Sequence, residues 1–244
     1  MAELESMGEQ ADTLPRHQQI PLAVQLRDDA TFSNFLALPR EEPLVRALHK
    51  QMASDGEAII YLYGPEGSGK THLLQACCHE SAEGAVYLPL AQLREFPAEE
   101  VLQGVERLGR VCIDDIHLVM GDADWETALF NFYNNARLHG CRLVVAGDAS
   151  PRALAVKLAD LRSRLSWGIV YQLDPGSDTE KSAILQFRAQ RRGLTLSASV
   201  AAYIVSRAPR AMDQLLLVLD VLDNASLTQQ RALTIPFVRE TLRW

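Results

Sequence analysis

The stretch of this sequence with the clearest chemistry is an octapeptide that could hold phosphate groups. It matches the pattern G-x-x-x-x-G-K-[ST] without departure, as Gly64, Pro65, Glu66, Gly67, Ser68, Gly69, Lys70 and Thr71. Glycines let the backbone wrap phosphate oxygens with N–H groups, and the lysine adds a point charge near the β- and γ-phosphates. An apolar run precedes the octapeptide and a helical pattern follows it through His72, so a helix N-terminus would also face the anion. The octapeptide and His72 therefore predict a site for ADP or another nucleoside di- or triphosphate.

Two later apolar runs end in carboxylates that suit the same chemistry. Asp114 and Asp115 follow residues 111–113, where a protein with this phosphate loop needs an acid to hold Mg²⁺ through its water shell. We expect Asp114 to serve the metal together with the Thr71 hydroxyl, and Asp115 to stand where a base would align an attacking water. Asp148 follows residues 143–146 and could sense the γ-phosphate or position water, although residues 147–151 also suit an ordinary turn.

Alternating apolar runs and helical stretches predict the fold that positions these residues. Short apolar runs typical of a parallel sheet buried on both faces occur at 58–63, 85–88, 111–113, 143–146 and 169–173. Helices are expected at 43–52, before the first of these runs, and at 124–139 and 151–161, between later runs. The second would be capped by Asp124, ended by Gly140, and packed through Trp125, Ala128, Leu129, Phe132 and Ala136. The fold class is thus α/β with a five-stranded parallel sheet.

A second, smaller unit is expected after the last strand. Ser177 and Glu180 form a capping box, and Gly193 suits the end of the helix that this box begins. Further helices are predicted at 198–207, 211–225 and 235–243. The α/β domain is therefore followed by a small helical domain.

Bulk composition narrows the class of protein. The 244 residues carry a formal charge of −7, which argues against bulk attraction to nucleic acid. The acidic start lacks the basic and apolar stretches of a signal peptide, and no run is long enough to span a membrane. The four cysteines show no metal-ligand spacing, which favours reduced, buried thiols. We expect a cytoplasmic protein with no membrane partner.

Five ordered segments resemble the AAA+ domain of the bacterial replication initiator DnaA. They are GPEGSGKTHLLQA at 64–76, IDDIH at 113–117, GDASPRAL at 147–154, RSRLSWG at 162–168 and LTIPFVRETL at 233–242. The resemblance implies a flexible N-terminal tail (1–30), an AAA+ nucleotide-binding domain (31–176) and a helical lid domain (177–244). The chain stops where an initiator would begin its DNA-binding domain, and in this it is similar to the Hda family of shorter, regulatory DnaA homologues.

The resemblance also assigns roles to residues that would otherwise carry little signal. Arg164 matches the family's arginine finger, which would act in trans on a partner's nucleotide, whereas a structural ion pair between the two domains is the alternative. Arg210 matches the sensor arginine of the lid. A clamp-binding peptide is matched by Gln19, Ile20, Pro21, Leu22, Ala23 and Val24.

In that family the nucleotide-bound protein docks on the DNA-loaded sliding clamp and stimulates ATP hydrolysis by DnaA, which prevents re-initiation. The expected partners are therefore the clamp, DnaA and, through the clamp, DNA, and a homo-oligomer stays open. Intrinsic ATPase activity would be slow at most. A helicase-loading AAA+ ATPase is the main alternative, although the sequence lacks a basic or aromatic stripe for single-stranded DNA. A small-molecule kinase is a further alternative without an evident acceptor site.

Overall fold

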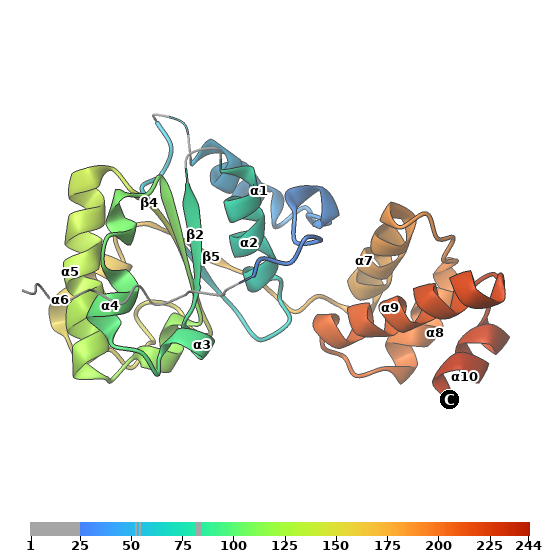
Figure 1. Cartoon of the computed structure of the whole chain (residues 1–244). Coiled ribbons are helices and arrows are strands. Elements are labelled where there is room, and N and C mark those ends of the chain that lie inside the picture. Colours follow the sequence, from blue (N-terminus) through green and yellow to red (C-terminus); the bar gives the residue numbers. More distant parts are fainter. Residues whose placement is uncertain (1–24, 52, 54, 82–83) are drawn as a thin grey trace, which may run out of the picture.

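The computed structural model of the chain describes residues 25–51, 53, 55–81 and 84–244. An α/β part holds the N-terminal two thirds of these residues, and a group of helices lies beside it (Figure 1). None of the described helices is long and apolar enough to cross a membrane.

Five parallel strands form the central sheet, as the sequence predicts. The strands are β1 (Ile59–Tyr63), β2 (Ala85–Pro89), β3 (Arg110–Asp114), β4 (Arg142–Gly147) and β5 (Ile169–Gln172). Their order in the sheet is β2-β3-β4-β1-β5, so every connection is a crossover and all carboxyl ends meet at one edge. The expectation of burial on both faces is confirmed for β1, β3 and β4, whereas β5 is largely exposed because it lies at the edge of the sheet.

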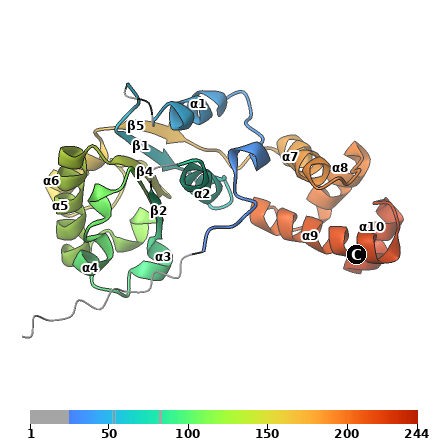
Figure 2. The same cartoon turned by 45° about the horizontal axis from the view of Figure 1, so that its top comes forward.

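Helices cover the two faces of the sheet (Figures 1 and 2). One face packs against α1 (Glu42–Lys50) and α2 (Lys70–Glu80). The other packs against α3 (Leu90–Leu93), α4 (Ala98–Leu102), α5 (Ala123–His139) and α6 (Ala159–Leu165). Alternate side chains of each strand enter the two cores, as the period of two requires. The predicted stripe on α5 is buried in the second of these cores.

Three short 3-10 turns connect these elements: η1 (Phe32–Asn34), η2 (Val105–Arg107) and η3 (Ile116–Val119). The helical part consists of α7 (Asp178–Arg191), α8 (Ala198–Arg207), α9 (Met212–Gln229) and α10 (Ile235–Leu242). It has a core of its own, in which Leu185, Ile204, Leu219 and Phe237 are fully buried. The predicted capping box of Ser177 and Glu180 is present at the start of α7.

Two local predictions are wrong. The expected helix at 151–161 is absent: residues 151–154 form turns on the Ser150 carbonyl, and α6 begins only at Ala159. The backbone N–H groups of Lys157 and Leu158 bind the buried Glu126 carboxylate instead of helical carbonyls. In α5 the capping side chain is Asp122, which accepts from the N–H groups of Asp124 and Trp125.

Buried polar chemistry joins the layers of the α/β part. All four cysteines are free and buried, as expected. Arg110 in β3 is completely buried, and its guanidinium donates to the carbonyl oxygens of Leu48 and Cys77 near the C-termini of α1 and α2. Helix C-termini carry unsatisfied carbonyls and partial negative charge, so this arginine links both helices to the sheet.

Candidate nucleotide-binding site

The predicted phosphate loop lies between β1 and α2 at the carboxyl edge of the sheet. Gly67 and Gly69 adopt positive φ angles of 73° and 95°, a region that other residues enter only with strain. A side chain at Gly64 would place its Cβ 2.1 Å from the carbonyl oxygen of Leu173. The strand–loop–helix context expected from the sequence is confirmed, and the N-terminus of α2 opens onto the loop.

Lys70 is the cation of this loop. Its ammonium group donates to the carbonyl oxygens of Gly64 and Pro65, each at 2.8 Å, and the residue is only 8% exposed. Burial lowers the pKa of Lys70, because desolvation disfavours the charged form. An ammonium held over the loop by two carbonyl bonds can exchange these partners for phosphate oxygens at little structural cost.

Thr71 and Asp114 meet as the metal hypothesis requires. The Thr71 hydroxyl donates to Asp114 Oδ2 at 2.7 Å, and the hydroxyl of Tyr87 donates to the same oxygen at 2.8 Å. Asp114 is almost completely buried. Within the described residues no group of three or more His, Cys, Asp or Glu side chains could hold a metal. The Thr71 hydroxyl and the Asp114 carboxylate suit Mg²⁺, which usually takes one or two protein oxygens and completes its coordination with phosphates and waters.

Asp115 and Asp148 lie together in the pocket above the loop, with a volume of about 400 Å³. Asp115 holds a left-handed backbone (φ 55°), and burial together with the neighbouring Asp114 raises the pKa of its carboxyl group. His117, which sequence reasoning missed, lines the same pocket, with its Nδ1 4.0 Å from Asp148 Oδ1. Asp115 and Asp148, which the sequence singled out separately, thus line one pocket next to the phosphate loop.

A second, apolar pocket adjoins the loop and also escaped the sequence analysis. Described residues from both parts of the chain line it, among them Phe35, Leu38, His72, Ile184, Met212 and Leu216. A Cβ at Gly67 would lie 3.1 Å from the backbone nitrogen of Met212, so α9 closely approaches the loop. An apolar cavity of this kind beside a phosphate loop suits a nucleotide base. No local pattern could have revealed it, because its walls come from three distant segments.

Comparison with known families agrees with this geometry. Residues 26–172 match the model of the bacterial DnaA ATPase domain, which covers more than half of the chain. The chain belongs to this DnaA family. Residues 178–242 of this DnaA-family chain further match the lid domain of Hda, so its helical part is of the Hda type.

Solved structures share the fold at low sequence identity. Domain III of DnaA from Thermotoga maritima superposes with a TM-score of 0.73 and 22% identity, over 90% of this chain and 98% of that one. AMPPCP-bound DnaA from Aquifex aeolicus gives 0.69 and 20%, over 81% of this chain and 66% of that one. The RuvB branch-migration motor of Thermotoga maritima gives 0.63 and 19%, over 83% of this chain and 67% of that one. These likenesses establish an AAA+ fold with a helical lid.

Of the residues assigned by the DnaA resemblance, Arg210 does not line either pocket. It precedes α9, its side chain is 80% exposed, and its guanidinium lies 4.0 Å from Asp178 Oδ2. Its carbonyl oxygen accepts from Lys181 at 2.7 Å. The sensor role of Arg210 therefore stays a prediction. The expected clamp-binding residues 19–24 lie outside the described residues.

Arg164 lies near the end of α6, and it is not among the described residues that line either pocket beside the phosphate loop. Its Nε donates to Asn134 Oδ1 at 2.9 Å, and its guanidinium carbon is 3.8 Å from the centre of the Trp167 ring. Within the described part of the chain no carboxylate lies within 4.0 Å of it. Among the described residues, therefore, no carboxylate is placed to form the structural ion pair with Arg164 that was the alternative to a finger.

Proposed function

We propose that this chain is a nucleotide-bound AAA+ regulator that docks on the DNA-loaded sliding clamp and stimulates ATP hydrolysis by DnaA. The position of Arg164 is the observation that carries the proposal. Three further features support it: the phosphate loop, the Hda-type lid and the clamp-like peptide.

Nucleotide binding follows from the phosphate loop and its two pockets. Gly64, Gly67, Gly69 and Lys70 would form the phosphate cradle, and the apolar pocket beside it would receive the base. The similar DnaA structures include one bound to AMPPCP and one bound to AMPPCP and single-stranded DNA. We infer that the chain holds ADP as its resting nucleotide, with Mg²⁺ held by Thr71 and, through water, by Asp114.

The place of Arg164 argues for action on another protein. Gly168 lies against Ile59, the first residue of β1, whereas the phosphate loop follows Tyr63 at the opposite end of that strand. The four steps from Ile59 to Tyr63, at about 3.3 Å each, separate the two ends of the strand by roughly 13 Å. Arg164 precedes Gly168 by four residues and is not among the described residues that line either pocket beside the phosphate loop, which supports action on another protein's nucleotide. Among the described residues no carboxylate pairs with this guanidinium, so it could exchange its bond to Asn134 for the phosphate charge that develops in a partner's transition state.

Clamp docking rests on residues 19–24, a glutamine followed by spaced apolar residues. The ring of a proline such as Pro21 fixes one backbone dihedral, which lowers the entropy lost on binding. The clamp would bring this chain and DNA together without direct contact between them. Regulation by the chain would then depend on clamps loaded on DNA.

The proposal is tested by measuring ATP hydrolysis by DnaA with DNA-loaded clamp and each variant. We expect Arg164→Ala and Arg164→Lys to abolish the stimulation, because an ammonium lacks the planar fork of arginine. Nucleotide binding, clamp binding and melting temperature should stay near those of the parent protein. Arg152→Ala removes an exposed arginine from the segment before α6 and serves as the matched control.

Full stimulation by Arg164→Ala would remove Arg164 from the mechanism. A large fall in its melting temperature would instead favour a structural role. A pull-down with clamp, DnaA and replicative helicase separates the regulator from the helicase loader, since only the loader should retain the helicase.

A further inference from the structure

The segment before α1, residues 25–41, crosses the junction of the two parts of the chain. It runs along α2 and past the start of α9 (Figure 2). The backbone of Arg27 is fixed to α2 at both of its polar groups. Its N–H donates to Gln75 Oε1 at 3.0 Å, and its carbonyl oxygen lies 3.0 Å from His79 Nε2.

These two bonds place Arg27 on the side of the phosphate loop where Thr71 and Asp114 lie. Gln75 follows Thr71 by four residues, so the two side chains share one face of α2. The Thr71 hydroxyl on this face bonds Asp114. Arg27 accordingly lines the pocket that contains Lys70, Thr71 and Asp115, and it is not among the described residues that line the apolar pocket.

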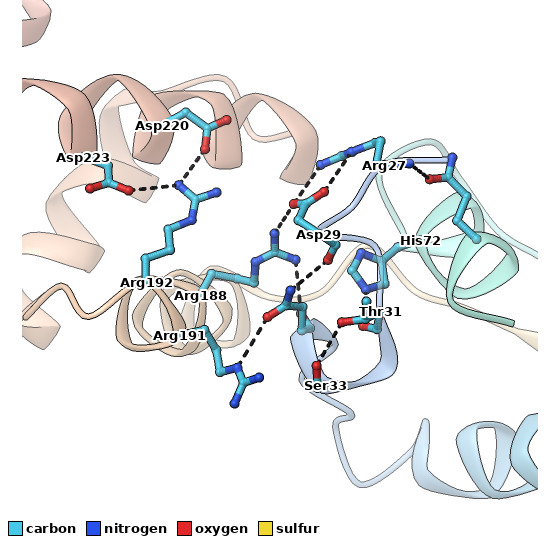
Figure 3. Close-up of polar contacts among 12 residues, drawn as sticks. Arg27, Asp29, Thr31, Ser33, His72, Arg188, Arg191, Arg192, Asp220 and Asp223 are labelled. Carbon is cyan, nitrogen blue, oxygen red and sulfur yellow. Dashed lines mark hydrogen bonds and ion pairs between the residues drawn. The ribbon is translucent and has the colours of Figure 1, made fainter. Parts of the chain in front are cut away.

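The guanidinium of Arg27 is held by a bond that it can exchange. Its Nε and Nη2 each lie 3.2 Å from an oxygen of Asp29, and the side chain is 56% exposed. An exposed ion pair of this kind contributes little to stability. Asp29 also binds Arg188 of the lid helix α7, a residue with only 5% of its side chain exposed (Figure 3). Asp29 therefore keeps a cation when Arg27 turns toward another anion.

The charges that line the pocket favour movement of the Arg27 guanidinium from Asp29 to a bound phosphate. Among the described residues that line it, Arg27 is the only arginine, and it joins Lys70 opposite Glu66, Asp115, Asp148 and Asp213. A nucleoside diphosphate would bring further negative charge to this acidic pocket. A guanidinium fork matches two phosphate oxygens at once, which an ammonium cannot do.

We propose that Arg27 binds the terminal phosphate of the nucleotide held in the phosphate loop. This inference rests on the proposed nucleotide site and adds to it a residue from outside the phosphate loop. Asp29 is then the resting partner of Arg27, and its bond to Arg188 keeps the lid attached while Arg27 is engaged.

Calorimetry with ADP tests the assignment. We expect Arg27→Ala to weaken ADP binding by about ten- to a hundredfold, the change that loss of a charge-assisted contact produces. Arg27→Lys should restore part of the loss because it retains the charge. Affinity for adenosine, measured by competition, should change less than twofold, since adenosine carries no phosphate. Arg46→Ala removes an exposed arginine of α1 and should match the parent protein.

Two further measurements separate the outcomes. If Lys70→Ala leaves ADP affinity unchanged, the proposed nucleotide site itself is wrong. If Lys70→Ala loses ADP while Arg27→Ala binds it like the parent, only the assignment of Arg27 is overturned. Equal losses of ADP and adenosine in Arg27→Ala, or a lower melting temperature of its nucleotide-free form, would show a structural role and also overturn it.

Discussion

Glu126 offers the sharpest test of how the segment before Arg164 is held. Its carboxylate is 1% exposed and accepts from the backbone N–H groups of Gly121 (2.7 Å), Lys157 (3.0 Å) and Leu158 (2.7 Å). These bonds join α5 to the loop before α6, the helix that carries Arg164. Replacing Glu126 with alanine would leave three backbone donors in a partly buried site without their acceptor.

The expected loss of stability follows from these bonds. A hydrogen bond to a charged group contributes about 1.5–3 kcal/mol, and water entering the site would recover part of the loss. We therefore expect Glu126→Ala to lower the free energy of unfolding by about 3–5 kcal/mol. At roughly 2–4 °C per kcal/mol for a chain of this size, the melting temperature would fall by about 6–20 °C. Glu126→Gln keeps one acceptor oxygen and should lose about half as much.

Urea and thermal unfolding measure this loss, with the exposed Glu95→Ala as the matched control. Burial would raise the pKa of Glu126, but the N–H groups of Lys157, Gly121 and Leu158 outweigh it and hold the pKa below its ordinary value. The stabilisation is thus complete above the unfolded-state pKa and is lost as the pH falls through the folded-state pKa. Glu126→Gln should flatten this acid dependence. A loss below about 1 kcal/mol in Glu126→Ala would refute the reasoning.

Three other predictions test the fold and the proposed function. Arg110→Ala should lower the free energy of unfolding, measured in urea, by about 3 kcal/mol or more, because two helix-end carbonyls lose their charged donors. The control Arg107→Ala removes an exposed arginine and should change the free energy of unfolding by less than about 0.5 kcal/mol. Deletion of residues 1–25 should abolish clamp binding in surface plasmon resonance and leave ADP affinity unchanged, whereas equal clamp affinity would disprove the docking peptide. The purified chain should hydrolyse ATP slowly, because Asp115 is a short base and Arg164 is not among the described residues that line the pockets at the phosphate loop. Turnover of many per second would contradict this.

The sequence by itself determined the parts of this protein that depend on neighbouring residues. The phosphate loop, the capping box at Ser177 and the five apolar strands are local patterns, and each is found where it was predicted. Asp114 and Asp115 could be chosen because a strand ending in carboxylates after a phosphate loop must reach the same edge of the sheet. The helix predicted at 151–161 failed because Glu126, distant in sequence, binds the backbone of that segment.

Only the tertiary structure decided which distant residues share a pocket. Arg27 carries no motif, and it enters the phosphate pocket because Gln75 and His79 fix its backbone to α2. The apolar pocket likewise appears only when the lid packs beside the phosphate loop. Arg164 could be named from the family pattern, but its contacts with Asn134 of α5 and with the Trp167 ring follow from the packing of α6 on α5. Local propensity acts over a few residues, whereas a contact such as that of Arg188 with Asp29 joins residues 159 apart in the sequence, and only packing of the whole chain brings them together.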